Sequence, residues 1–341
     1  MALVAFDGYD HYNTLTDFYA RTGALQYWRP GVGYPAVTTP GRNGFGKCLS
    51  FGDQDTTYFI FNQAPANAGV GFAFRCSAGN TCTATFRDSI AGSQQCNIYF
   101  GEGYRVTFSR GNTALAVSPN NVWVGNVWNW VEWWVDLSDT VGTCTLLING
   151  VTIFSLTGLD NKNTANNWID SFSFGGLAYF DDFYYADRTT GPGTVPFNGP
   201  VGDIKVQTLF PISDHSVQFT PSSGASNYAM VDETAMDSDT TYNHSSNPTD
   251  EDTFIFQSLA SNIVSVFGIQ LIGAYRKDDA SVRTMKQVII TSATSYYAAT
   301  FNLSDTSYSY HCDLWVINPN TSANWTVAQI NGLAAGYNLV A

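Results

Sequence analysis

Residues 121–137, NVWVGNVWNWVEWWVDL, carry five of the chain's nine tryptophans: Trp123, Trp128, Trp130, Trp133 and Trp134. On a β-strand, successive side chains point to opposite faces. From residue 127 onward, tryptophan occurs at both even and odd positions, with valine between, so both faces of such a strand are apolar. A sugar-stacking platform would display one or two exposed rings. The pattern therefore favours a strand buried between its own core and a second layer, with Trp123 and Trp133 as candidate interface residues.

The composition of the whole chain points to the same class of structure. Its 341 residues suggest about two domains. Hydrophobic residues make up 44% and charged residues only 13%, which argues against disorder. Glutamate and lysine, which normally fill exposed helices, are scarce, while Thr, Tyr, Phe and Val are frequent. These features predict β-structure.

Short alternating runs bounded by turn residues recur along the chain, among them TTYFIFNQ, GVGFAFRC, CTATFRDS and YRVTFSRG. The pair Asn149-Gly150 between two β-prone runs predicts a tight hairpin. The proline- and glycine-rich segment RTTGPGTVPFNGPVGD, residues 188–203, reads as a linker. We therefore predict an all-β protein with two antiparallel β-sandwich (jelly-roll) domains, residues 1–187 and 204–341, joined by that linker.

Charge and targeting signals limit the partners. The formal net charge of −13 disfavours nucleic acid and anionic lipid surfaces. The amino terminus has neither the basic segment nor the apolar run of a secretory signal, and no run approaches the roughly 20 apolar residues of a membrane span, so we expect no membrane insertion. Six cysteines lack metal-site spacing and are expected as free thiols, although Cys76 and Cys82 could be bridged across a hairpin.

The tryptophan-rich strand, the hairpin ending in Asn-Gly and the later strand YFDDFYYAD resemble, in that order, the laminin-G-like or concanavalin-A-like jelly-roll family over residues 1–187. The second half, with VGDIKVQTLFPISD, QFTPSSGASNYAMVDE and NPNTSANWTVAQINGLAAGY, resembles a module that follows such a jelly roll in tailed-phage virion proteins. The resemblance implies a virion structural protein, made in the host bacterial cytoplasm and assembled with other virion proteins, with homo-oligomers expected from virion symmetry.

Three functions follow from this resemblance and the residues. The leading one is a non-enzymatic, tail-associated fibre or adhesin subunit that attaches the particle to a host-surface glycan. The alternatives are a head-decorating or cement protein, and a secreted-type carbohydrate-active enzyme or lectin. Hydrolysis is disfavoured, because Glu132 and Asp136, four residues apart on one strand face, would be about 13 Å apart, beyond the roughly 5–9.5 Å that paired catalytic carboxylates span. We therefore predict no enzymatic activity.

Two sets of candidate site residues remain. The loop QYWRPGVGYP offers Tyr27, Trp28, Arg29 and Tyr34 in a stiff proline and glycine frame, where an aromatic face could stack on a sugar ring. The polar segment MDSDTTYNHSSNPTDED concentrates carboxylates of the kind that hold calcium, and Asp237, Asp239 and Asp250 are the candidate ligands. We predict no other cofactor.

Overall fold

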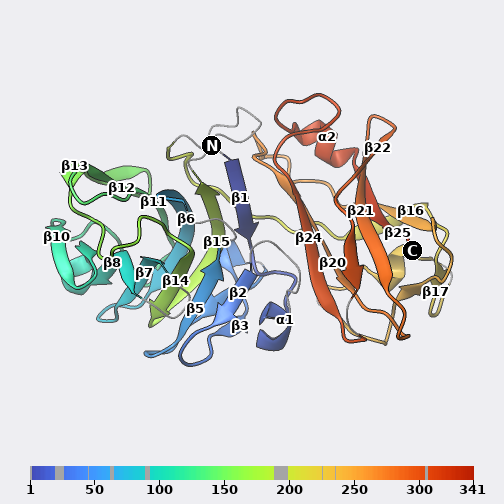
Figure 1. The fold of residues 1–341 in the computed structure, drawn as a ribbon, viewed down its shortest axis with the longest axis horizontal. Coiled ribbons are helices and arrows are strands. Elements are labelled where there is room, and N and C mark those ends of the chain that lie inside the picture. Colours follow the sequence, from blue (N-terminus) through green and yellow to red (C-terminus); the bar gives the residue numbers. More distant parts are fainter. Residues whose placement is uncertain are drawn as a thin grey trace. The chain divides into compact units, whose positions relative to one another are not determined.

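The computed structural model describes residues 2–19, 27–44, 46–61, 65–88, 93–187, 199–224, 226–234, 236–303 and 306–341. The chain divides into two compact units (Figure 1). The first unit extends to Val206, and the second consists of Gln207–Ala341 together with His11–Asn13. Among the described residues, no helix has the length and apolar character needed to cross a membrane.

The first unit is built from two antiparallel sheets. The eight-stranded sheet has the order β13-β12-β11-β6-β15-β4-β3, and β1 pairs with β15. Its strands are β1 (Ala2–Asp7), β3 (Ala36–Thr38), β4 (Cys48–Ser50), β6 (Asn67–Cys76), β11 (Asn129–Asp136), β12 (Gly142–Ile148), β13 (Val151–Leu159) and β15 (Ala178–Asp187). The predicted hairpin joins β12 to β13 through Asn149 and Gly150, which both have positive φ.

The second sheet of this unit has seven strands in the order β10-β9-β8-β7-β14-β5-β2. They are β2 (Tyr27–Pro30), β5 (Thr56–Ile60), β7 (Cys82–Arg87), β8 (Gln94–Gly101), β9 (Arg105–Arg110), β10 (Thr113–Val117) and β14 (Ser171–Gly176). The short helical elements among the described residues of this unit are α1 (Leu15–Tyr19), η1 (Arg42–Gly44) and η2 (Glu102–Tyr104).

The second unit is also antiparallel. A six-stranded sheet has the order β16-β19-β25-β21-β22, and β23 pairs with β21, while β17-β18 and β20-β24 form two-stranded ribbons. The strands are β16 (Pro211–Ser216), β17 (Thr220–Pro221), β18 (Asn243–His244), β19 (Glu251–Phe256), β20 (Ile269–Tyr275), β21 (Arg283–Thr291), β22 (Thr294–Tyr297), β23 (Phe301–Leu303), β24 (Ser309–Trp315) and β25 (Ala334–Leu339), with η3 (Tyr228–Met230) and α2 (Val327–Asn331) as helices. The β20-β24 ribbon packs on the sheet through a core that includes Ile289, Trp325 and Trp315. The predicted all-β class with two antiparallel sandwiches is therefore confirmed.

The tryptophans of β11 and the preceding loop lie in the core of the first unit. Trp133 is fully buried between the two sheets, with ring centroids 4.4 Å from Phe86 and 6.3 Å from Phe108. Trp123, 2% exposed, packs edge-on against Phe74 and Tyr104. The hypothesis that Trp123 and Trp133 form an interface with another subunit or domain is wrong, since the unit's own aromatic residues enclose both rings.

The opposite face of β11 is buried as well, as the sequence predicted. Trp130, Glu132 and Trp134 are at most 3% exposed. Two glycines of the neighbouring strand β6 leave room for rings on this face. A Cβ atom on Gly69 would lie 2.2 Å from the Trp134 ring, and one on Gly71 would lie 2.0 Å from the ring of Tyr184. The Gly-Val-Gly of β6 therefore lets these rings lie close against the sheet.

Residues 199–206, which we call the cover segment, lie over this outer face. The Glu132 carboxylate accepts hydrogen bonds from the backbone N–H groups of Val201 at 2.6 Å and Gly202 at 3.1 Å, and from the Tyr184 hydroxyl at 3.0 Å. Burial raises the pKa of Glu132, and these hydrogen bonds oppose that shift. Residues 199–203 of the predicted linker thus pack on the first unit, while residues 188–198 lie outside the described residues.

We expect Trp133→Ala to lower the free energy of unfolding of the first unit by about 3–5 kcal/mol, because it leaves a large cavity between the sheets. Tyr34→Ala is the matched control: Tyr34 is 76% exposed, and its loss should change stability by less than about 0.5 kcal/mol. Chemical denaturation of both variants measures the difference. Equal effects would contradict the core assignment of Trp133.

Candidate functional site

The outward face of the seven-stranded sheet carries mostly polar side chains, and these line up in rows across neighbouring strands. Residues directly opposite each other in antiparallel strands point to the same face. The pairing register aligns one row as Arg29, Tyr58, Ser173, Thr85, Asn97 and Ser109. A second row runs through Thr56, Gly175, Thr83, Tyr99 and Thr107. The alternate positions of the same strands, such as Phe86 and Phe108, point into the core.

This face is hollowed into a groove of about 520 Å³, within the size range of small-molecule sites. Its lining residues are Thr56, Thr83, Thr85, Arg87, Gln94, Asn97, Tyr99, Thr107, Ser109, Gly111, Asn112, Ala114, Ser173 and Phe174. Hydroxyl and amide groups predominate, with one guanidinium group and the Tyr99 ring, which is 39% exposed. Among these described residues there is no carboxylate, so the groove is equipped for hydrogen bonding and stacking.

Arg87 stands at the end of strand β7, on the groove face. Its Nε donates a hydrogen bond to Ser173 Oγ at 3.0 Å, and its guanidinium carbon lies 5.3 Å from the centre of the Tyr58 ring. Burial lowers the pKa of the Arg87 guanidinium, and the Tyr58 hydroxyl opposes that shift. The positive charge is therefore partly desolvated and held in a fixed position by its hydroxyl and aromatic neighbours.

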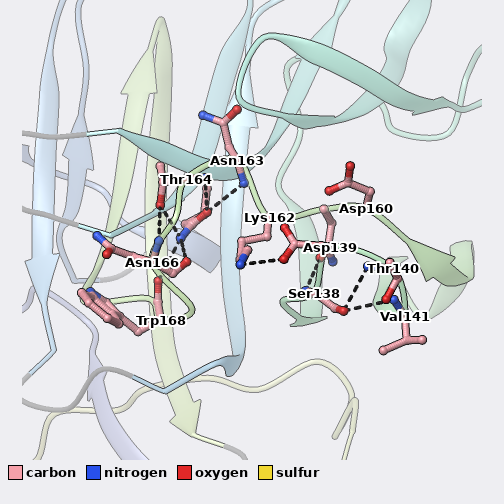
Figure 2. A network of polar contacts seen from close by, with 12 residues as sticks. Ser138, Asp139, Thr140, Val141, Asp160, Lys162, Asn163, Thr164, Asn166 and Trp168 are labelled. Atoms are coloured by element: carbon pink, nitrogen blue, oxygen red, sulfur yellow. Dashed lines mark hydrogen bonds and ion pairs between the residues drawn. The ribbon is translucent and has the colours of Figure 1, made fainter.

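The loop 160–168 borders the groove and is held by the buried side chain of Gln95. Gln95 Oε1 accepts hydrogen bonds from the backbone N–H groups of Asn163 at 2.9 Å and Thr164 at 3.2 Å. Its Nε2 donates to the carbonyl oxygens of Asn166 at 2.8 Å and Trp168 at 3.3 Å. Figure 2 shows Asn163, Thr164, Asn166 and Trp168 within this network of polar contacts. A single fully buried amide thus replaces the regular backbone pairing that the loop lacks.

Further contacts fix the first residues of the same loop. Asn161, fully buried, accepts from the backbone N–H of Ser138 and donates to the carbonyl oxygens of Asp136 and Thr143. Lys162 pairs with Asp139 at 2.8 Å (Figure 2). The side chain of Asn163 donates to the carbonyl of Gln94, a groove residue. The loop is therefore a fixed border of the groove.

The ligand residues predicted from the loop QYWRPGVGYP occupy different places. Trp28 is fully buried, its Nε1 donates to Asp7 at 3.1 Å, and its ring packs against Phe59 and Phe183. The hypothesis that Trp28 stacks on a sugar is wrong, because strand β2 turns this residue into the core. Arg29 is exposed on the groove face, and the side chain of Tyr27 lies outside the described residues.

Tyr34 is exposed, and its backbone N–H donates to Asp55 Oδ1 at 3.0 Å in the loop beyond β2. It is not among the residues that line the groove. The structure thus places Arg29 and Tyr34 on the surface without bringing them together into one pocket. Tyr34 stays a predicted ligand residue of a separate loop.

The structure does not assemble the predicted calcium site. Asp237 accepts from Thr241 Oγ1 at 2.9 Å, Asp239 pairs with Arg276 at 2.8 Å, and Asp250 accepts from Ser245 Oγ at 2.5 Å. In the part of the chain that the structure describes, no group of three or more His, Cys, Asp or Glu residues is placed to hold a metal ion. The three carboxylates are hydrogen-bonded or ion-paired to separate partners, so the ligand set predicted from their proximity in sequence is wrong.

The six cysteines are free thiols, and five of them are buried. Cys76 ends strand β6 of the eight-stranded sheet and Cys82 begins strand β7 of the seven-stranded sheet. Both thiols are nevertheless close enough to hydrogen-bond to each other, and each is free, so the disulfide that the sequence allowed is not formed in this structure.

A second cluster of charges lies on the covered face of the eight-stranded sheet. Asp181 accepts hydrogen bonds from the backbone N–H groups of Arg42 and Asp182, at 2.6 and 2.8 Å. Asp182 accepts from the Val206 N–H at 2.8 Å and pairs with the Arg42 guanidinium at 3.2 Å. Arg42 also pairs with Asp203 at 2.6 Å and lies over the Trp130 ring. This cluster fastens the cover segment to the sheet.

Burial, together with the neighbouring Asp182 carboxylate, raises the pKa of Asp181 to about 8. Burial also raises the pKa of Asp182, while the Val206 N–H and Arg42 oppose that shift. Two carboxyl groups next to each other in a buried site cannot both ionise without cost. The pair therefore retains a proton under conditions in which exposed aspartates have lost theirs.

The sequence reasoning missed the groove residues, although a signal for them was present. The runs CTATFRDS and YRVTFSRG place Thr83, Thr85, Thr107 and Ser109 at every second position, opposite buried apolar residues. The alternation by itself predicts strands and does not show which face is open. Residues of this kind on one face of several neighbouring strands mark a polar sheet surface.

Comparison with known proteins gives remote similarity of fold. No protein-family model matches the chain, and no curated protein matches it. Among solved structures it is similar to lectin II from Ulex europaeus, with a TM-score of 0.34, 10% identity and coverage of 50% of this chain and 95% of the lectin. A galectin-like protein of unknown function from Bacillus subtilis gives 0.34, 10%, 53% and 97%. A galectin from Caenorhabditis elegans gives 0.29, 8%, 49% and 99%. These TM-scores lie below 0.5, so the similarity does not indicate a ligand.

Gln95→Ala should increase hydrogen exchange of the backbone amides in residues 163–168 and lower stability by about 1–3 kcal/mol, because several loop groups lose their buried partner. Exchange measured by mass spectrometry checks this. Gln54→Ala removes an exposed glutamine and should leave protection of the loop unchanged. Unaltered protection in the Gln95 variant would show that other contacts hold the loop.

Asp181→Asn should change how stability depends on pH. The pKa of Asp181 is about 8 in the folded chain and about 3.9 when unfolded. Between these values the folded state binds more protons, so the stability of the natural chain falls as pH rises from 5 to 8. Relative to the variant, the natural chain should lose on the order of 1–3 kcal/mol over that range. Denaturation at several pH values measures this, and a constant difference would contradict it.

Proposed function

We propose that the groove on the seven-stranded sheet of the first unit binds a glycan, and that the chain is a non-enzymatic, glycan-binding adhesin subunit. The observation that supports this is the hollow of about 520 Å³ lined by rows of hydroxyl and amide side chains around the exposed Tyr99 ring. The groove lies on rigid strands and is bordered by a loop that Gln95 holds in place.

The chemistry of the lining matches that of a sugar. Each sugar hydroxyl both donates and accepts hydrogen bonds, and threonine, serine and asparagine side chains can do the same. Thr83, Thr107 and Tyr99 lie in neighbouring strands of one row. The Tyr99 ring provides an apolar face for the C–H face of a pyranose. Polar groups on a sheet surface with a nearby ring can thus fix the orientation of a saccharide.

The positions of the carboxylates favour binding over hydrolysis. Glu132 is 1% exposed beneath the cover segment and is hydrogen-bonded to Val201 and Gly202. Asp136 accepts a hydrogen bond from Thr143 Oγ1 at 2.7 Å. Glycoside hydrolysis needs two carboxyl groups flanking the scissile bond. Neither of these groups is among the described residues that line the groove.

The virion location, tail-fibre role, homo-oligomerisation and virion partners stay predictions from the sequence resemblance. A glycan groove supports host attachment rather than a head-decorating role. A cement protein would need an assembly surface, and the two tryptophans predicted for such a surface, Trp123 and Trp133, lie in the core. We therefore keep attachment to a host-surface glycan as the proposed role.

Tyr99→Ala should weaken glycan binding about tenfold. Without the tyrosine ring, roughly 50 Å² of the apolar sugar face would stay exposed to water, and at ~25 cal/mol per Å² this costs a little over 1 kcal/mol of binding free energy. A printed array of oligosaccharides identifies a binder, and calorimetric titration then compares the variants. Tyr34→Ala is the control, since both tyrosines are exposed but only Tyr99 lines the groove. Loss of binding in the Tyr34 variant alone would instead locate the site at the loop beyond β2.

A further inference from the structure

The groove face carries a charge opposite to that of the chain. The protein has 28 acidic and 15 basic residues. On the outward positions of the seven-stranded sheet, however, the charged side chains of the described residues are Arg29, Arg87 and Arg105, and none is acidic. The outward positions of this sheet therefore carry a positive charge, although acidic residues outnumber basic ones in the chain as a whole.

Arg87 is the arginine that lines the groove itself. Ser173 and the Tyr58 ring are among the contacts that hold its guanidinium, and neither of these two neutralises the positive charge. A planar guanidinium can form paired hydrogen bonds with a carboxylate or sulfate group, which a lysine cannot reproduce. Its fixed position reduces the entropy lost when such a group binds.

The acidic residues adjacent in sequence to the β7 and β14 strand ends are engaged elsewhere. Asp88, 7% exposed, accepts hydrogen bonds from Thr164 Oγ1 at 2.5 Å and Asn166 Nδ2 at 3.0 Å. Asp170 accepts from Ser171 Oγ at 2.9 Å, and burial raises the pKa of its carboxyl group. Their hydrogen bonds belong to the loop 160–168 and to strand β14. Both carboxylates therefore support the groove's border.

We propose that the groove's ligand is an acidic glycan, whose carboxylate or sulfate substituent is bound by Arg87. This inference rests on the proposed glycan-binding function and specifies its ligand class. The net charge of −13 repels polyanions at a distance. Beyond about 8 Å this repulsion is screened at physiological ionic strength. Preference for an acidic glycan must therefore come from local contacts in the groove.

Two matched ligand pairs test the proposal with the full chain. Comparing the affinity for polygalacturonate with that for its fully methyl-esterified form tests whether a carboxylate is recognised. Comparing dextran sulfate with dextran tests whether a sulfate is recognised. In at least one pair, the acidic form should bind about tenfold or more tightly, as expected for hydrogen bonds between charged partners. Arg87→Gln should abolish most of that preference in protein that circular dichroism shows to be folded. Equal affinity within both pairs would overturn the proposal.

Arg276→Gln is the matched control, because it removes the same charge from the second unit, where Arg276 pairs with Asp239. An equal loss of preference in this variant would indicate unspecific attraction and overturn the role of Arg87. Arg87→Lys keeps the charge without the planar guanidinium group, so it should retain only part of the preference for acidic ligands. If neither Arg87→Gln nor Arg87→Lys weakens that preference, the role of Arg87 is overturned. Binding of neutral array glycans, abolished by Tyr99→Ala, with no acidic preference would refute this inference and leave the proposed function standing. No glycan binding at all would refute both.

Discussion

The hydrogen bonds that Glu132 accepts from Val201 and Gly202 determine how the first unit is closed. Strand β11 is buried on both faces, so each face needs a covering layer. The seven-stranded sheet covers one, and the cover segment lies over the other. A buried carboxylate without such partners would cost several kcal/mol. The Glu132 contacts, with the Arg42 pair to Asp203, therefore connect the covering chain to the sheet at defined points.

Coverage of the outer face explains why the two sheets of the first unit serve different purposes. The eight-stranded sheet carries Trp130 and Trp134 on its outer side and uses them for packing. The seven-stranded sheet has threonine, serine and asparagine at its outward positions around the groove, where Thr85, Ser173, Ser109 and Asn97 are at most 9% exposed and Tyr99 is 39% exposed. The first sheet thus contributes stability, whereas the second presents a polar surface whose shape is fixed by regular strands and by the loop that Gln95 holds.

The sequence was sufficient for features that depend on local periodicity, and insufficient for those that depend on distant pairing. The alternation in residues 127–135 predicts burial of β11 on both faces, and Asn149-Gly150 predicts its hairpin. Trp28 was misassigned because the prolines and glycines around it suggest a loop, while its pairing with Phe59 of β5 turns it inward. Of the aspartates assigned to calcium, Asp239 pairs with Arg276, which is 37 positions away, whereas Asp237 and Asp250 accept hydrogen bonds from the nearby Thr241 and Ser245. The sequence does not show which sheet has an uncovered outer face, because that depends on where residues 199–206 lie.

The closure of the first unit also sets an order of events during synthesis. Glu132 and Val201 are separated by 69 positions, so β11 leaves the ribosome well before the segment that covers it. Until that segment emerges, the Glu132 carboxylate on this apolar face lacks the N–H groups of Val201 and Gly202, and the nascent sandwich leaves the face open to chaperones or to other chains. The first unit can therefore fold completely only after residues beyond its last strand have been synthesised. A chain that ended at Asp187 would lack the segment that covers this face.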